Sequence, residues 1–435
     1  APPAAPKTNI ASSRVTESWK EDLTIEEKWA TRPNKIAREF IKAQTGTNPQ
    51  FDVKMALQKS VKEPEYALRD VEIRDGLWQI MDSMDQLTKN YFGYHIEQPN
   101  GMLPASYFEH FPAETAKIIG CVASGGPTGV HGWNDLFVDE PKRCALVAAI
   151  IGNVIVEQVF QHMLFGGNEK DIQAMIQLQR DHKDEDGFER NRYYASCIRS
   201  TLKPADSKHF QLPTNLSNHV NYIVAAIYKH ILPFEQPYTR SDSGPPRPFL
   251  VRDIHDIVVQ AALLSISMRL DPHTVYYFEP MFKEDTFTAS RMECFNQKQM
   301  ELQNPRQNCK DEQLTPEEIV RRSKISEKEK KRAKNDDPLT QIAIMDSVTA
   351  YRLGGWEMPS STLEKQQFEK PEWARKGVRA RMLTHGWVYC RWGRARRFKD
   401  GKTDDRADAH GDQWKDGFKE FTDVDGVIDW LGMER

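Results

Sequence analysis

The sequence predicts a mainly α-helical fold with a helical domain, a charged helical connector and a small C-terminal β-containing module. Three observations lead to this prediction. Apolar residues recur every three or four positions through much of the chain, as on a helix with one buried face. A segment of almost entirely charged residues follows, and beyond Pro338 the apolar period shortens towards two, as in strands. The predicted units are a partly disordered N-terminal tail and leading segment (1–59), the helical domain (60–303), the connector (304–337) and the β-containing module with an acidic C-terminal tail (338–435).

Composition limits the class of protein. The chain has 435 residues, enough for two or three domains, and its net charge of −3 gives no overall attraction to a polyanion. Its six cysteines are widely spaced and form no CxxC pair. This spacing argues against a disulfide scaffold or a zinc finger and favours free thiols in a reducing compartment. We therefore expect an intracellular protein, cytoplasmic or nuclear.

Two stretches bear on targeting. The N-terminal residues are rich in proline and lack an apolar run, so they predict a tail rather than a secretory signal. The longest apolar stretch, 144–156, is interrupted by Gly152 and Asn153 and is too short to cross a bilayer. No membrane span is expected.

Four helices are predicted in order. Apolar residues at alternating three- and four-residue spacing mark a core-facing helix over 73–91. Asp139 is a favourable N-cap for an apolar helix that runs from 140 to the paired glycines after Phe165, and this helix should be buried on most sides. Similar patterns predict helices over 216–231 and 254–268.

Within the connector, a capping-box sequence begins at Thr315. This motif predicts a charged helix that continues to Lys334 and lies in solvent. The segment KEKKRAK, 328–334, is similar to a nuclear-import patch, but the interspersed acids Glu327 and Glu329 favour a solvated helix face.

Strand patterns occur in three places. Residues 274–278 predict a short strand or an extended linker. Residues 341–352 predict one strand, either regular or bulged at Asp346 and Ser347. Residues 377–393 predict either a second pair of strands or one long bent strand.

No motif predicts a specific catalytic chemistry. The glycine-rich run 121–132 lacks the lysine of a P-loop, so a plain loop before a helix is the better interpretation. The sequence signatures of zinc proteases, serine hydrolases and zinc deaminases are missing. We predict no catalytic residue, no cofactor and no metal site, while single histidines and cysteines leave a hidden catalytic arrangement open.

The strongest functional signal is a basic, aromatic segment near the C-terminus. Between Pro371 and Lys402 ten basic residues face two acids, and alternation places Trp387, Tyr389 and Arg391 on one face of a strand. Stacking aromatics beside arginines is a way to hold single-stranded nucleic acid. The candidate nucleic-acid-binding residues are Arg379, Arg381, Trp387, Tyr389, Arg391, Arg394, Arg396 and Arg397.

An acidic tail competes with this interpretation. Residues 403–435 contain ten acids and four bases, together with aromatic residues that favour burial. A tail that folds back would neutralise the arginines within the protein, and this alternative is favoured. A protein partner for the basic segment is the third alternative.

Several stretches resemble a family of uncharacterised proteins of filamentous ascomycete fungi. The resemblance implies a fungal source and a helical domain followed by a short β segment, with no established activity, cofactor or site residue. It extends over most of the chain beyond about residue 70 and rests on these stretches: 144–167, 188–200, 253–280, 341–355 and 377–396.

Three functional hypotheses follow. The first is a non-catalytic scaffold or protein-interaction protein with an unidentified protein partner. The second is a protein that binds RNA or single-stranded DNA through the basic segment. The third is an enzyme with a pocket between the helices near residues 124–132, where ionisable side chains would converge.

Overall fold

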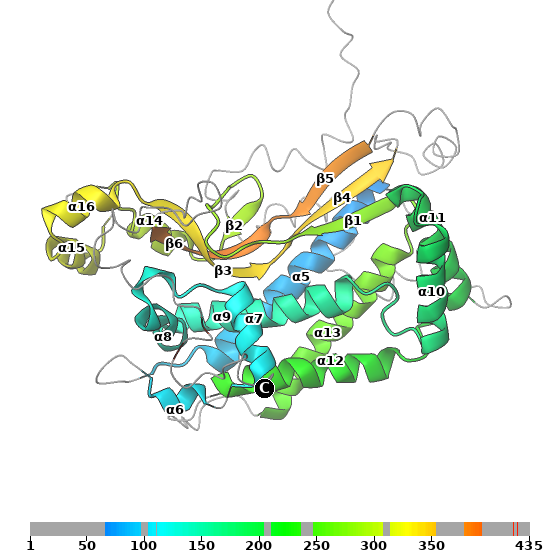
Figure 1. The fold of residues 1–435 in the computed structure, drawn as a ribbon, viewed down its shortest axis with the longest axis horizontal. Coiled ribbons are helices and arrows are strands. Elements are labelled where there is room, and N and C mark those ends of the chain that lie inside the picture. The colour runs from blue at the N-terminus through cyan, green and yellow to red at the C-terminus, as the bar shows by residue number, and fades with distance from the viewer. Residues whose placement is uncertain are drawn as a thin grey trace, which may run out of the picture.

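The computed structural model describes residues 66–96, 103–109, 111–203, 210–235, 247–307, 314–353 and 378–393, together with Phe421 and Val424. The mainly α-helical class is confirmed, and a layer of strands lies across one side of the helices (Figure 1). The helices are α5 (Tyr66–Phe92), α6 (Ala105–Phe108), α7 (Ala113–Val122), α8 (Val130–Val138), α9 (Glu140–Ile155), α10 (Glu169–Asp181), α11 (Gly187–Leu202), α12 (Leu216–Ile231), α13 (Arg247–Arg269), α14 (Gln297–Leu302), α15 (Pro316–Ser323) and α16 (Glu327–Ala333).

The apolar helix α9 begins where the sequence predicts and ends earlier. Asp139 caps it by accepting a hydrogen bond from the Lys142 N–H at 3.1 Å. The helix ends at Ile155 and continues as one π-turn over Val156–Phe160, so the prediction of a helix up to the paired glycines is wrong. The π-turn alters the local hydrogen bonding, and Ser265 Oγ of α13 donates to the carbonyl of Val159 at 3.0 Å.

The strands form two three-stranded sheets, and the chain passes from one sheet to the other between β3 and β4 and between β5 and β6. The strands are β1 (Thr274–Glu279), β2 (Met292–Cys294), β3 (Asp337–Met345), β4 (Ser347–Leu353), β5 (Val378–Thr384) and β6 (Gly386–Gly393). One sheet has the order β1-β4-β5 and is antiparallel, and the other has the order β2-β6-β3, in which β2 runs parallel to β6. The predicted strand over 341–352 is divided at Asp346, and the second predicted stretch is a pair of strands divided at His385.

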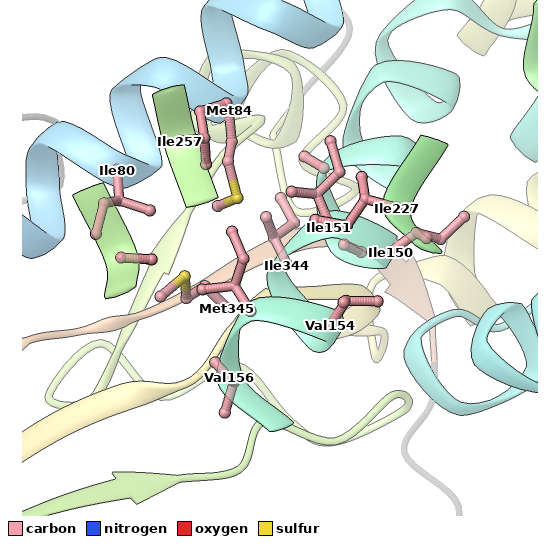
Figure 2. Packing of buried hydrophobic residues seen from close by; sticks show 14 of the residues in the cluster. Ile80, Met84, Ile150, Ile151, Val154, Val156, Ile227, Ile257, Ile344 and Met345 are labelled. Carbon is pink, nitrogen blue, oxygen red and sulfur yellow. The ribbon is translucent and has the colours of Figure 1, made fainter. Parts of the chain in front are cut away.

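The core joins helices and strands. Ile344 and Met345 of β3 lie among apolar side chains of α5 and α9 such as Met84 and Ile151 (Figure 2). Gly152 of α9 approaches the sheet so closely that an added Cβ would lie 2.2 Å from the carbonyl oxygen of Ile344. The predicted boundary at 337/338 therefore crosses a continuous hydrophobic core, and two of the six strands, β1 and β2, lie before it along the chain.

The charged connector differs from its prediction. Thr315 caps α15 as expected, accepting from the Glu318 N–H at 3.3 Å. The predicted single helix is instead divided, because Ser326 and Glu329 form a second cap that starts α16: the Ser326 N–H donates to the Glu329 carboxylate at 3.1 Å, and the Glu329 N–H donates to Ser326 Oγ at 3.3 Å. Arg322 of α15 is also buried, so this helix does not lie wholly in solvent.

One helical stretch in the described part of the chain, Glu140–Phe160, has the length and hydropathy of a membrane span. In its most apolar window, 83% of the residues are buried inside the protein. Burial of this kind is typical of a central core helix, so the stretch is weak evidence for a membrane span.

Candidate functional site

A cleft of about 800 Å³ lies at the end of the sheet where β6 finishes. Its walls are formed by β6, α14, α15, α16 and the first turn of α9, and Figure 1 shows α15 and α16 beside the ends of β3 and β6. Segments from three separate regions of the sequence therefore meet here. This volume is within the range of small-molecule sites in proteins.

The cleft lining is rich in cations and amides. Among the described residues that line it, two carry carboxylates, Glu327 and Asp336. Five amide side chains add hydrogen-bond donors and acceptors: Asn296, Gln299, Gln303, Gln307 and Gln341. We call the site the basic cleft after its seven cationic side chains, which are Lys142, Arg321, Arg322, Lys330, Lys331, Lys334 and Arg391.

Ion pairs within α15 hold two of the arginines that line the cleft. Glu318 accepts hydrogen bonds from Arg321 at 2.7 and 2.6 Å and from Arg322 at 2.7 Å. Burial raises the pKa of Glu318, but the hydrogen bonds from the two arginines outweigh it and the net pKa is lowered. Arg322 also donates to the carbonyls of Leu302, Asn304 and Gln307, each at 2.8 Å, so one guanidinium holds α15 against the chain that follows α14.

Arg391 is held in place from two directions. Its guanidinium pairs with the Glu284 carboxylate through two nitrogens, and both side chains are largely buried. Gly126 lies beside it, with the position of a Cβ at that glycine 3.5 Å from Arg391 Nε. The charge of Arg391 is therefore compensated within the protein.

The aromatic side chains of the cleft are tied to α14. Tyr389 is 1% exposed, its hydroxyl donates to Gln299 at 2.7 Å, and burial raises its pKa well above the ordinary value. The indole N–H of Trp392 donates to the carbonyl of Met300 at 2.8 Å. Asn296 bonds both backbone groups of Cys390, at 2.8 and 2.9 Å, as a strand partner would. The cleft floor is thus fixed by specific hydrogen bonds.

Three lysines of the cleft have weak or no pairing with the described acidic side chains. Lys331 of α16 and Lys334, the residue that follows the helix, are exposed, and their side chains make no hydrogen bond or ion pair with the described residues. Lys142, in the first turn of α9, has one long contact of 3.8 Å to the exposed carboxylate of Asp135. These three ammonium groups are the ones that a ligand could engage.

Two of the sequence-predicted site residues lie far along the sheet from the cleft. Arg379 and Arg381 of β5 both pair with Asp70 of α5, which is 1% exposed, and Arg381 does so at 3.3 Å. Arg352 of β4 joins the same carboxylate at 2.9 Å. These arginines link the sheet to α5 through Asp70, and the acids of the tail lie outside the described residues.

The other six predicted nucleic-acid-binding residues fall into three groups: one buried in the core, two in the cleft lining and three outside the described residues. Trp387 is 1% exposed, and its indole N–H donates to Glu293 at 3.1 Å, so its ring is packed inside the protein. Tyr389 and Arg391 are the two that line the cleft. The predictions for three arginines concern positions outside the described residues: Arg394, Arg396 and Arg397.

The predicted burial of tail aromatics applies to Phe421. This ring is fully buried and lies within 5.1 to 6.2 Å of aromatic rings that include Trp133 and Phe137 of α8. Phe421 therefore packs against α8.

The glycine-rich run has a packing role in the described structure. The N–H of Ser124 donates to the carbonyl of Gln341 in β3 at 2.9 Å, which docks the loop onto the sheet. A Cβ at Gly132 would lie 1.6 Å from the carbonyl oxygen of Gly125, so the loop and α8 meet closely. Arg391 and Glu284 are the ionisable pair beside it, and no group of three or more potential metal ligands occurs in the part of the chain that the structure describes.

Sequence reasoning missed the role of α16 in forming a site. Lys331 and Lys334 belong to the segment interpreted as a solvated helix face or an import patch. The signal was the local excess of lysine, but nothing in the sequence shows that this helix faces β6 and the first turn of α9.

Comparison of the chain with models of known protein families, with curated proteins and with solved structures gave no match. The resemblance to proteins of ascomycete fungi therefore stays a prediction.

Proposed function

We propose that this chain is a non-catalytic binding protein that takes up a phosphate-bearing partner in the basic cleft. The observation that carries this proposal is the convergence of seven cationic side chains and two carboxylates on a cleft of about 800 Å³. Opposite charge in a concave, partly desolvated site is the arrangement that concentrates and holds anions. The proposal narrows the predicted scaffold or interaction protein to one with a charged recognition site.

The chemistry of the lining supports binding more than turnover. Cys390 is the nucleophile of the lining, and its hydrogen bond with Cys294, together with burial, raises the pKa of its thiol. A protonated thiol is a poor nucleophile. The arginines are engaged in ion pairs and in hydrogen bonds to carbonyls, as expected of groups that shape a site. An enzyme that uses this cleft remains a weaker alternative.

Binding of RNA or single-stranded DNA is the second candidate function. The observation that favours it is that Tyr389 and Arg391, both in the predicted nucleic-acid-binding set, line the basic cleft. The chain after β6 continues with Arg394, Arg396 and Arg397, which would extend a basic path. If the protein binds nucleic acid in this way, its affinity for RNA or single-stranded DNA should fall steeply as the salt concentration rises.

Retention on phosphocellulose at low salt tests the proposed function. We expect the wild-type protein to be retained despite its net charge of −3, because the phosphate groups of the resin engage the local cation cluster. The double variant Lys331→Glu/Lys334→Glu should elute at a markedly lower salt concentration. The matched control, Lys324→Glu/Lys328→Glu, makes the same charge change at exposed positions of the same segment outside the cleft lining.

The control decides the outcome. Equal loss of retention in the two double variants would show that overall charge rather than the cleft binds the resin, and the proposal would be rejected. A third variant, Arg394→Gln/Arg396→Gln/Arg397→Gln, tests the second candidate, which requires that this triple change weaken retention of the protein on single-stranded DNA resin.

A further inference from the structure

The seven cations of the basic cleft fall into two groups. Arg321 and Arg322 share Glu318, Arg391 is paired with Glu284, and Lys330 contacts Glu327 at 2.6 Å. The other group, defined above, consists of Lys142, Lys331 and Lys334. A bound anion could engage Lys331 and Lys334 without breaking an ion pair with a described residue, and at Lys142 it would compete only with the 3.8 Å contact to Asp135. The ammonium groups of this group therefore determine which ligand the cleft prefers.

Lys331 and Lys334 are three residues apart. Lys331 lies in the last turn of α16, and Lys334 directly follows the helix, where its N–H still donates to the carbonyl of Lys330 at 3.2 Å. This helical spacing keeps the two side chains close together. Each ammonium is a flexible point charge that binds phosphate oxygens without a fixed geometry. Lys142 adds a third charge from the first turn of α9. Three ammonium groups around one cleft match a ligand with several phosphates close together.

The aromatic side chains do not offer stacking surfaces of the kind that single-stranded nucleic acid uses. Tyr389 is buried, and Trp392 is half-buried with its ring nitrogen bonded to Met300. Proteins that hold single strands combine a long basic groove with aromatic rings on which successive bases stack. A cleft of about 800 Å³ suits a compact molecule better than an extended strand.

We infer that the basic cleft binds a compact small molecule that carries several phosphate groups, held by Lys142, Lys331 and Lys334. This inference rests on the proposed function and names its ligand class. A nucleoside triphosphate and a polyol polyphosphate share this chemistry. The amide side chains Gln303 and Gln307 in the lining are able to bond either the base or the hydroxyl groups of such a ligand.

Isothermal titration calorimetry on the full chain tests the inference. The probes are inorganic tripolyphosphate, adenosine triphosphate, inositol hexakisphosphate and a ten-nucleotide oligo(dT), each titrated in the same low-salt buffer. We expect tripolyphosphate to bind more tightly than oligo(dT) at equal phosphate concentration. Lys331→Glu/Lys334→Glu should weaken tripolyphosphate binding by roughly tenfold or more, since two attractive charges are lost and two repulsive charges replace them. Lys324→Glu/Lys328→Glu should leave it within about twofold of wild type.

The outcomes separate the inference from the proposed function. Tighter binding of adenosine triphosphate or of inositol hexakisphosphate than of tripolyphosphate supports the inference and assigns the source of the phosphates. Tighter binding of oligo(dT), weakened by the cleft variant, overturns the inference and leaves the proposed function in place. Equal binding of tripolyphosphate by wild type and by the cleft variant, with both folded by circular dichroism, overturns both. The exposed position of both lysines makes misfolding of the variant a small concern.

Discussion

Arginine and lysine side chains have different roles in this protein. The buried guanidinium of Arg143 donates to the carbonyls of Phe92, Tyr94 and Phe137, and Arg322 does the same for the chain after α14. A planar group with five donors is suited to this task, whereas an ammonium is more strongly hydrated and stays at the surface. This difference explains why Arg379 and Arg381 are paired with an internal carboxylate, while the lysine-rich stretch of α16 contributes exposed charge to the cleft.

Asp346 lies at the break between β3 and β4. Its carboxylate accepts the N–H of Met281 at 3.3 Å, and burial, with Glu157 nearby, raises its pKa to about 6 from 3.8. A raised pKa means that ionisation opposes folding. The loss of folding stability caused by this ionisation is absent below pH 4, grows as the pH rises towards 6 and is complete above pH 6.

We predict that Asp346→Asn raises the free energy of unfolding at pH 7.5 by about 1–2 kcal/mol and changes it little at pH 4.5. The amide oxygen of asparagine preserves the bond from Met281 and removes the buried charge. Urea denaturation of wild type and variant at both pH values measures the difference. Asp184→Asn, at an exposed position, is the control and should change stability by less than about 0.5 kcal/mol. An equal effect of Asp346→Asn at the two pH values would contradict the account.

At the scale of elements, the contact between α9 and β3 determines how the two layers pack. Gly152 lies within α9, where alanine would ordinarily stabilise the helix by about 0.5–1 kcal/mol. Here the added Cβ would lie 2.2 Å from the carbonyl oxygen of Ile344, which is backbone and cannot rotate away. We therefore predict that Gly152→Ala destabilises the protein by about 1–3 kcal/mol in urea denaturation.

Gly120 of α7 provides the matched comparison. No atom lies within 4 Å of the position that its Cβ would take. Gly120→Ala should therefore stabilise the protein by about 0.5–1 kcal/mol, the opposite sign to Gly152→Ala. If both substitutions changed the free energy of unfolding in the same direction, α9 would not approach the sheet as closely as described.

The existence of helices and strands was largely predictable, but the points where they are interrupted were less so. Periodicity located α5, α12 and α13 because apolar residues recur at helical spacing in each, although residues 261–268 of α13 are buried on all sides. The π-turn after α9 depends on partners in α13, which are far away in sequence. The division of the connector at Ser326 was predictable, since Ser326 and Glu329 form a capping box. The charged residues around them also fit one continuous helix, which is why a single helix was predicted.

For the molecule as a whole, the site could not be predicted from sequence because it exists only between segments. Lys142, Lys331 and Arg391 come from three regions that the fold brings together at the end of the sheet. Sequence reasoning identified Arg391 and Tyr389 as candidates and placed the other two regions in different roles. The partner of Arg391 is Glu284, an acid that no local pattern connects with it.

The anion position is the most direct test of the central claim, that uncommitted lysines make the basic cleft an anion site. Crystals of the full chain soaked in tungstate, a phosphate-like anion with strong anomalous scattering, would show where anions bind. The account predicts the strongest peak inside the cleft, within about 3–4 Å of the ammonium groups of Lys331 and Lys334 or of Lys142. Strong peaks at other surface lysines with none in the cleft would contradict it.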